Sequence, residues 1–476
     1  MFFCGGAINA RERDPDMKSF GRGKIVNDFT KGPIFSTLVK FSLPYMLSNF
    51  LQVIYSVVDM IVVGHCVGHA GMAAVAVASR SYGFLVLLCV GVTAGAQIYL
   101  AQMIGRGDRS KLGRAVGTIF TIMTIISVVS FFMMIFLSGP FLKLINTPDE
   151  VFDDAHNYML LRTIGIFFIF GYNMFSAVLR GVGDSKHPMI FVMTSAILNL
   201  VLDIWFVAGL GMGVNGAAIA TVIALGVKFV ISAVFLYRRR AEIGFDFRWG
   251  SWCIDRDIAK GILRIAIPLG IRHVALDVSM IFVQAQVNII GVAAMAVFVS
   301  GVRLDNTVHT LATGIYSGAS GIIGQNYGAH KIGRIRTTVH YTWLICAVLY
   351  AVYVALLLLF PNELFGIFTS DREVRELVPV FVSAMIWHFP ASTINKGTTA
   401  LILGIGNAWL SFALSFSDAF VLRVLLSWLL GTKLGYGLFG YILGYALAGY
   451  GVAIPGLIYY FFCPWHKRKL VTDVGS

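Results

Sequence analysis

The chain has 476 residues, of which 57% are hydrophobic and only 13% are charged. Soluble domains are less apolar and about 25% charged, so this composition excludes an ordinary soluble protein and indicates an integral membrane protein. The net charge of +13 does not indicate nucleic-acid binding, because the basic residues are spread over the short segments between apolar runs.

The apolar runs predict an all-α protein with twelve transmembrane helices, since each is near or above the ~20 residues that cross a bilayer. The runs cover residues 38–63, 72–100, 115–138, 158–179, 188–209, 214–237, 262–290, 294–323, 339–360, 377–403, 408–431 and 438–463. Residues 1–33 are polar and contain no apolar signal sequence, so we expect no cleavable signal peptide. An even number of spans places both termini on one side.

Charge predicts which side that is. With both termini in the cytoplasm, most Lys and Arg residues fall in cytoplasmic segments, including Arg106–Arg114, Arg238–Arg240 and Lys467–Lys469, whereas the outer loop Asn146–Asp154 is acidic. This distribution satisfies the positive-inside rule and predicts cytoplasmic N- and C-termini.

The two halves of the chain repeat each other at an offset of 223 residues. This offset superposes Arg80 on Arg303, Gly91 on Gly314, Gly95 on Gly318, Gln102 on Gln325, Gly105 on Gly328, Gly181 on Gly404 and Gly183 on Gly406. Six helices per half give a parallel repeat about an axis along the membrane normal, which suits alternating access. We therefore predict an N-terminal tail (1–33), an N-lobe (34–237), a connector (238–257), a C-lobe (258–463) and a C-terminal tail (464–476).

Five acidic residues fall within the predicted spans, where an ionisable group is costly and usually has a function. They are Asp59, Asp203, Asp277, Asp305 and Asp418. Asp59 ends a polar stripe with Asn49, Gln52 and Ser56 at steps of three and four residues, which places the four side chains on one helix face. The stripe lines either a cavity or an interface with a neighbouring helix.

Asp203 and Asn199 are four residues apart and share a helix face, and Thr221 on the next predicted helix is positioned to reach the same pocket. The alternative is a permanently protonated acid that only joins two helices. At the repeat offset Asp59, Asn199 and Asp203 meet Phe282, Leu422 and Leu426, so the C-lobe lacks this set. The N-lobe is therefore the candidate site for cation coupling.

The C-lobe offers a second polar face. Asp277, Gln284 and Asn288 lie at steps of seven and four residues and are candidates for lining a substrate cavity. Asp305 is another candidate, with an ion pair to Arg303 as the alternative, and we expect a structural role for Asp418. Intramembrane bases outnumber the acids, which leaves the charge of the substrate open; they are Arg80, Arg162, Lys228, Arg272, Arg303, Lys396 and Arg423.

No cofactor is expected. The GxGxxG match at Gly211–Gly216 lies between two spans without the strand and helix of a dinucleotide site, and no complete phosphate-binding loop is present. Energy must then come from an ion gradient. The cysteines lack paired spacing, so no metal site is expected beyond a possible Na⁺ at Asp59, Asn199 and Asp203.

Several segments together resemble the MATE (multidrug and toxic compound extrusion) transporters of bacteria, over residues 34–462. They are Val58–Gly64, Asn199 with Asp203, Gly216–Thr221, and the repeated Gln-x-x-Gly turns such as Gly324–Ala329. The resemblance implies an H⁺- or Na⁺-coupled antiporter of the bacterial inner membrane that exports amphipathic, often cationic, drugs. It assigns the cation site to the residues matching Asp59, Asn199, Asp203 and Thr221.

Two alternatives remain. A flippase for lipid-linked saccharides, from the same wider superfamily, gains support from the intramembrane bases. An integral membrane transferase would need a catalytic cluster at the membrane surface, and the sequence shows none. The expected partners are a small-molecule substrate and membrane lipids, with no nucleic acid, and we expect a monomer.

Overall fold

A computed structural model describes residues 26–108, 110–145, 147–369 and 371–473. Within these ranges the regular secondary structure is helical, with no strand. Helices are the expected solution because each satisfies its backbone hydrogen bonds internally, which a chain in hydrocarbon requires.

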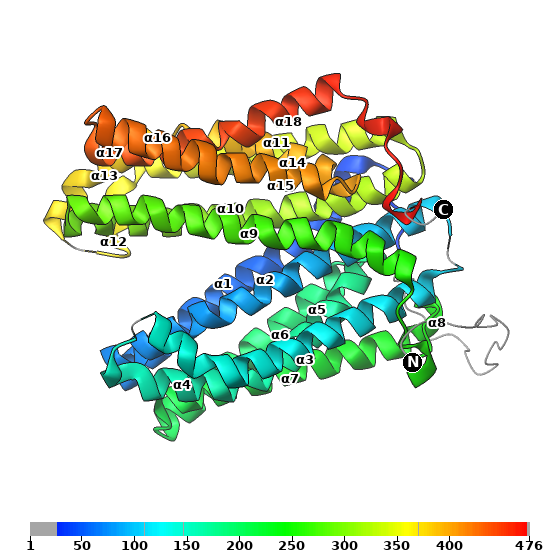
Figure 1. The fold of residues 1–476 in the computed structure, drawn as a ribbon, viewed down its shortest axis with the longest axis horizontal. Helices are drawn as coiled ribbons and strands as arrows, with labels where there is room; N and C mark the ends of the chain where they lie inside the picture. Colours follow the sequence, from blue (N-terminus) through cyan, green and yellow to red (C-terminus); the bar gives the residue numbers. More distant parts are fainter. Residues whose placement is uncertain (1–25, 109, 146, 370, 474–476) are drawn as a thin grey trace.

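The helices form two lobes that lie side by side (Figure 1). The N-lobe contains α1 (Ile34–Val67), α2 (His69–Arg106), α3 (Leu112–Leu144), α4 (Asp149–Thr163), α5 (Gly165–Gly181), α6 (Lys186–Asp203) with the π-helix η1 (Ile204–Gly209), and α7 (Gly213–Arg238). The short elements α8 (Arg240–Ile243) and η2 (Trp249–Ser251) follow.

The C-lobe repeats this order. It contains α9 (Arg256–Ile290), α10 (Val292–Gly328), α11 (Ile332–Leu359), α12 (Pro361–Gly366), α13 (Arg372–Met385), α14 (His388–Gly404), α15 (Ala408–Phe416), η3 (Ser417–Arg423), α16 (Val424–Trp428), η4 (Leu429–Lys433), α17 (Gly437–Ala448) and α18 (Tyr450–Phe462). The chain ends in the short elements η5 (Trp465–Lys467) and η6 (Val471–Asp473).

These elements account for twelve membrane spans. Among the described residues, eight helices are long and apolar enough to cross a membrane by themselves, and up to ten spans result when each of two bent pairs is one span. The long helices α2 and α10, of 38 and 37 residues, run through the same bundle and complete six spans per lobe (Figure 1). The predicted fold class is confirmed.

The two bent spans occupy equivalent places in the repeat. The pair α4 and α5 bends by 46°, and the pair α13 and α14 bends by 47°. Asp149 and Arg372, which begin the two pairs, are separated by the repeat offset of 223 residues. In the C-lobe Pro390 lies in the first turn of α14, where its missing N–H costs no helical hydrogen bond.

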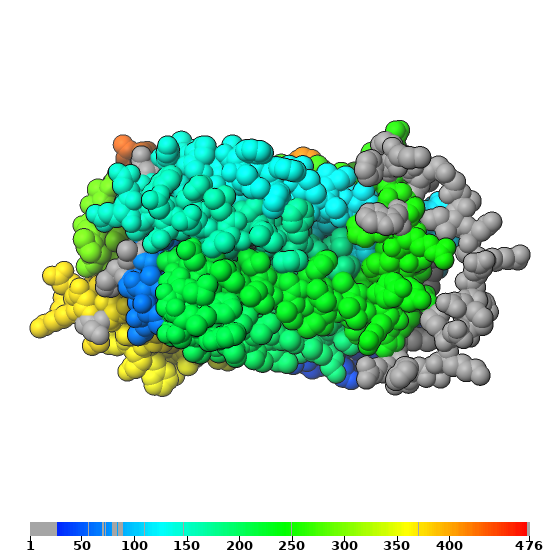
Figure 2. Space-filling view, turned by 90° about the horizontal axis from the view of Figure 1, so that it is seen from below, coloured from blue at the N-terminus to red at the C-terminus, as the bar shows by residue number. Residues whose placement is uncertain are grey.

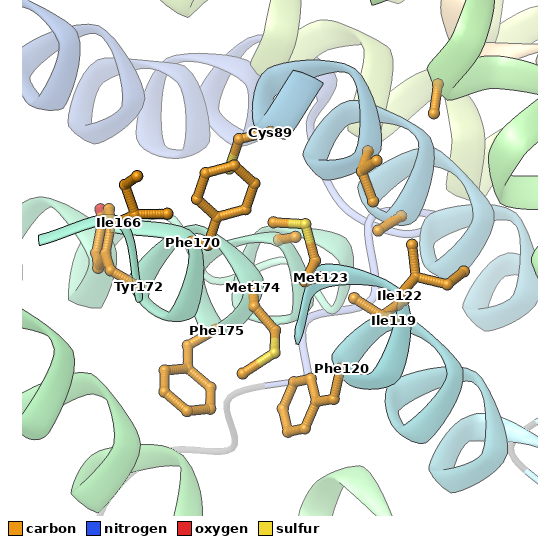
Figure 3. Close-up of a cluster of buried hydrophobic side chains, with 14 of the residues drawn as sticks. Cys89, Ile119, Phe120, Ile122, Met123, Ile166, Phe170, Tyr172, Met174 and Phe175 are labelled. Atoms are coloured by element: carbon orange, nitrogen blue, oxygen red, sulfur yellow. The ribbon is translucent and has the colours of Figure 1, made fainter. Parts of the chain in front are cut away.

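Each lobe has an apolar core and an apolar outer surface. In the N-lobe, α2, α3 and α5 bury a cluster that includes Phe120, Met123, Phe170 and Phe175 (Figure 3). The outer face of α3, in cyan in Figure 2, exposes large apolar side chains such as Phe136. Such a surface is unfavourable in water and is suited to lipid.

The lobes meet where α1 packs against α10, where α2 packs against α9, and where α2 crosses α10, near the end that carries the terminal segments (Figure 1). There Gly105 packs against the backbone of Gln325, and the repeat-related Gly328 packs against the backbone of Gln102. Each glutamine also bonds a terminal segment: Gln102 Oε1 accepts from the Val471 N–H at 3.0 Å, and Gln325 Oε1 accepts from the Phe29 N–H at 2.8 Å. The repeated Gln-x-x-Gly turns therefore close this end of the molecule.

Candidate functional site

The N-lobe brings together the four residues predicted to form the cation site. Asp59 lies on α1, Asn199 and Asp203 on α6, and Thr221 on α7, and these three helices pack against one another. All four residues are buried, with exposed fractions of 8%, 1%, 0% and 1% respectively. The carboxylates of Asp59 and Asp203 are near enough to interact electrostatically.

Several polar atoms of this cluster have no hydrogen-bond partner among the described residues. They are Oδ1 of Asp59, both carboxylate oxygens of Asp203, and Nδ2 of Asn199. Buried polar groups in proteins are nearly always hydrogen-bonded, so orphaned atoms in one place require an explanation. The orphaned carboxylate oxygens of Asp59 and Asp203 are of the kind that hard cations prefer as ligands, whereas Nδ2 of Asn199 is a donor and is suited to an oxygen acceptor.

The backbone around Asp203 is also specialised. Asp203 is the last residue of α6, and the chain continues at once into the π-helix η1. Gly216 on α7 allows this segment to approach, because a Cβ at Gly216 would lie only 3.2 Å from the carbonyl carbon of Phe206. π-Helical turns are rare and occur frequently at functional sites.

Sequence reasoning missed three neighbours of the acid cluster. Arg162 of α4 interacts electrostatically with Asp59, and its Nη1 donates to the Tyr158 hydroxyl at 3.1 Å. The Tyr55 hydroxyl donates to Thr221 Oγ1 at 3.4 Å. The charge of Arg162 within a span was the available signal, but its partner lies more than 100 residues away in sequence.

The remaining residues of the two predicted polar faces are more dispersed. Gln52 is exposed, and its Nε2 donates to the Ser48 carbonyl of its own helix at 3.1 Å. Ser56 falls among the side chains that lie outside the described part of the structure. Gln284 is half-buried and Asn288 is exposed, and neither lines the C-lobe cavity described next.

The C-lobe contains a cavity of about 380 Å³ with several charged side chains, bounded by residues of α9, α10, α14, α15, η3, α17 and α18. Asp277 and Asp305, both predicted to line a cavity, lie on its wall together with Arg272, His309 and Lys396. Asp305 is buried and faces the Tyr445 hydroxyl at 3.4 Å and His388 Nε2 at 3.9 Å.

Asp418, for which we expected a structural role, forms an ion pair with Arg423 at 3.0 Å. The Arg423 Nη1 also donates to the Ser279 hydroxyl at 3.1 Å, which joins η3 to α9. No group of three or more His, Cys, Asp or Glu side chains suited to a metal ion occurs over the described ranges.

A family model supports the repeat and the fold. The MatE model matches residues 44–205 and again residues 268–429, one match in each lobe. Solved structures with the same fold include an outward-facing MATE family multidrug transporter of the MOP superfamily, with a TM-score of 0.86 and 24% identity over 93% of this chain and 98% of that one. A MOP superfamily transporter from Pyrococcus furiosus, described as having a binding pocket of reverse polarity, has a TM-score of 0.86 and 23% identity over 93% of this chain and 98% of that one.

Curated relatives agree along most of the chain. The probable multidrug resistance protein YpnP of Bacillus subtilis is 26% identical over 94% of this chain and 99% of its own length. The multidrug export protein MepA of Staphylococcus aureus is 21% identical over 79% of this chain and 82% of its own length. The chain therefore belongs to the MatE family of multidrug and toxic compound extrusion transporters, and it is a multi-pass membrane transporter rather than an enzyme.

Proposed function

We propose that this protein is an H⁺- or Na⁺-coupled antiporter that exports amphipathic compounds by alternating access. One observation carries the proposal: the N-lobe buries two carboxylates, Asp59 and Asp203, and leaves oxygens of both without hydrogen-bond partners among the described residues. Acids in a membrane span are costly, and proton- or ion-coupled transporters use such groups to bind their coupling ion.

The lobe arrangement supports alternating access. The lobes pack tightly at the end that carries the terminal segments and lean apart towards the end that carries α4 and α12 (Figure 1). A parallel repeat lets one lobe rock against the other, so the same two surfaces close one end or the other. Binding of a cation to Asp59 and Asp203 changes the charge of these carboxylates and the hydrogen bonds that they can form. This change alters which packing of α1, α6 and α7 is more stable.

The gradient supplies the driving force, since one charge that crosses 100 mV provides roughly 2.3 kcal/mol. We place the transporter in the bacterial inner membrane with both termini in the cytoplasm. The bases near the closed end support this orientation, among them Arg106 of α2, Arg238 of α7 and Arg334 of α11. We propose that it works as a monomer among lipids.

The cargo has two candidates. The family resemblance favours a cationic drug, and the N-lobe acids favour the same charge. The cavity of the C-lobe favours the second candidate, an anionic amphiphile such as a lipid-linked saccharide, because Arg272, Lys396 and Arg423 lie on its wall.

Gradient-driven uptake into everted vesicles tests the coupling. Wild type and Asp203→Asn are compared with an imposed pH or Na⁺ gradient, using ethidium as the cationic probe and indole-3-acetate as the anionic probe. We expect gradient-driven uptake in wild type and its loss in Asp203→Asn, because an amide carries no negative charge and does not gain or lose a proton near neutral pH.

Asp154→Asn is the matched control, since it removes one exposed carboxylate from the same lobe on α4. It should transport at the wild-type rate. Equal gradient-driven uptake by Asp203→Asn and wild type would refute coupling at this site. The ion whose gradient drives uptake identifies the coupling ion.

A further inference from the structure

We propose that the C-lobe cavity binds the anionic group of an amphipathic molecule, through Lys396 and Arg272. This inference rests on the proposed export function, whose cargo it specifies as an organic anion with a carboxylate or phosphate group.

Lys396 is the first reason. It lies on α14, is 4% exposed, and lines the cavity. Its ammonium contacts the His309 ring, with Nε2 at 3.0 Å, and Thr313 Oγ1 at 3.4 Å. No carboxylate of the described residues lies within 4.0 Å of it. Its electrostatic partner, Asp305, stays beyond ion-pair distance, so the buried ammonium is compensated only in part, and an anion in the cavity would offset the remaining cost.

Arg272 is the second reason. It reaches the cavity from α9, and its Nη1 donates to the Ser411 hydroxyl at 2.9 Å. Its buried Nε has no partner in the described part of the chain, and no ion pair involves this residue there. Arginine presents planar donors that match carboxylate and phosphate groups, so the free donor indicates an oxyanion rather than a halide.

The acids of the cavity form no ion pair with either base among the described residues, although Asp305 interacts with Lys396 electrostatically. Asp418 is paired with Arg423 at 3.0 Å. Asp305 accepts a hydrogen bond from Tyr445 and faces His388. Asp277 also lies on the cavity wall, and among the described residues it forms no ion pair with either base. Two bases thus face the cavity while two of its three acids are engaged by other residues.

The cavity also has room for an apolar portion. Leu276 and Met280 lie on its α9 wall, and Tyr316 lies on its α10 wall. A volume of about 380 Å³ falls within the usual range for small-ligand pockets. Bases beside apolar and aromatic surface suit a molecule with one anionic end and one apolar end.

The N-lobe supplies a matched control lysine. Lys228 of α7 is also buried, with 6% of its surface exposed. Each lysine ammonium lies near an aromatic ring: that of Lys228 is 4.2 Å from the centre of the Tyr172 ring, and that of Lys396 is 5.1 Å from the centre of the Tyr316 ring. Lys228 does not line the C-lobe cavity. Replacing each lysine by glutamine therefore removes the same buried charge, but only Lys396→Gln should change an anion site.

Equilibrium dialysis of the purified full-length protein tests the proposal without any gradient. The probes are radiolabelled indole-3-acetate and tryptamine, which share an aromatic ring system and carry opposite charges. Wild type should bind the anion about tenfold more tightly than the cation, the difference expected from one charge-assisted contact. Lys396→Gln and Arg272→Gln should each weaken anion binding about tenfold, and Lys228→Gln should leave it unchanged. Arg272→Lys should weaken it less than Arg272→Gln, because lysine keeps the charge but not the planar donors.

Arg272 is half-buried, so its substitutions keep the test valid if Lys396→Gln fails to fold. Equal binding of the two probes by wild type, or anion binding unchanged in both glutamine variants, would overturn the proposal. Asp203→Asn separates the two proposals: it should bind the anion normally while gradient-driven uptake is lost. Normal anion binding with uptake that no gradient drives would refute the coupling and leave the anion site standing.

Discussion

The crossing of α2 and α10 makes a quantitative prediction about Gly105. A Cβ at this position would lie 2.6 Å from the carbonyl carbon and 2.8 Å from the Cα of Gln325, and closer still to its carbonyl oxygen. Ordinary contact begins near 3.4 Å, so the carbonyl carbon alone requires the two backbones to separate by about 0.8 Å in Gly105→Ala, and the nearer oxygen requires more. Both partners are backbone, so no side-chain rotation relieves the overlap.

The cost follows from that displacement. Overpacking a close-packed contact by one methyl group costs about 1–3 kcal/mol. This penalty falls only on the arrangement in which the lobes meet at this end, so it should raise the population of the opened arrangement about 5- to 150-fold. Gly328→Ala should act in the same direction, because its Cβ would lie 3.0 Å from the carbonyl carbon of Gln102 and closer to its oxygen.

Thiol labelling measures this population. Ser42 is 3% exposed, and its hydroxyl bonds the Ile315 carbonyl of the other lobe at 3.3 Å. The reaction of Ser42→Cys with a water-soluble maleimide, measured on purified protein and corrected for the parent thiols, should therefore accelerate when Gly105→Ala is added. Gly333→Ala is the control, since a Cβ there meets no atom within 4 Å. Labelling and thermal stability that are equal in Gly105→Ala and Gly333→Ala would refute the reasoning.

Two further predictions concern the contacts of single arginine side chains. Arg423→Leu should destabilise the protein by about 3–5 kcal/mol, because it leaves Asp418 buried without its ion-pair partner. The double variant Arg423→Leu with Asp418→Leu should recover most of that loss in stability. Thermal unfolding measures both effects, and a double variant no more stable than the single one would contradict the prediction. Arg334 donates to the backbone carbonyls of Phe29, Lys31 and Gly32, so Arg334→Lys should loosen that segment and speed tryptic cleavage after Lys31 about tenfold. Arg372→Lys, which alters only an exposed pair with Glu376, should leave the cleavage rate unchanged.

The sequence alone predicted the architecture and the acid cluster of the N-lobe. The architecture followed from twelve apolar runs, the repeat offset of 223 residues and the positions of the basic residues. These features can be read from the sequence once the thickness of the bilayer is known. The cluster of Asn199, Asp203 and Thr221 could be predicted because its members lie on one helix face or on consecutive helices, where spacing in the sequence determines which side chains are close together. Asp59 was included in the predicted site because an acid within a membrane span is costly and usually has a function.

The tertiary structure decided which distant groups meet. Lys396 contacts His309, 87 residues away, and Gln102 bonds Val471, 369 residues away. Neither contact has a local signal, because a membrane helix is apolar around most of its circumference and its sequence does not show which face meets another helix. The sequence identified Arg272 and Lys396 as bases within spans. Only the packing of α9 against α10 and of α10 against α14 placed both bases around one cavity. The physical reason is that helix packing, and not spacing in the sequence, sets the distance between separate helices.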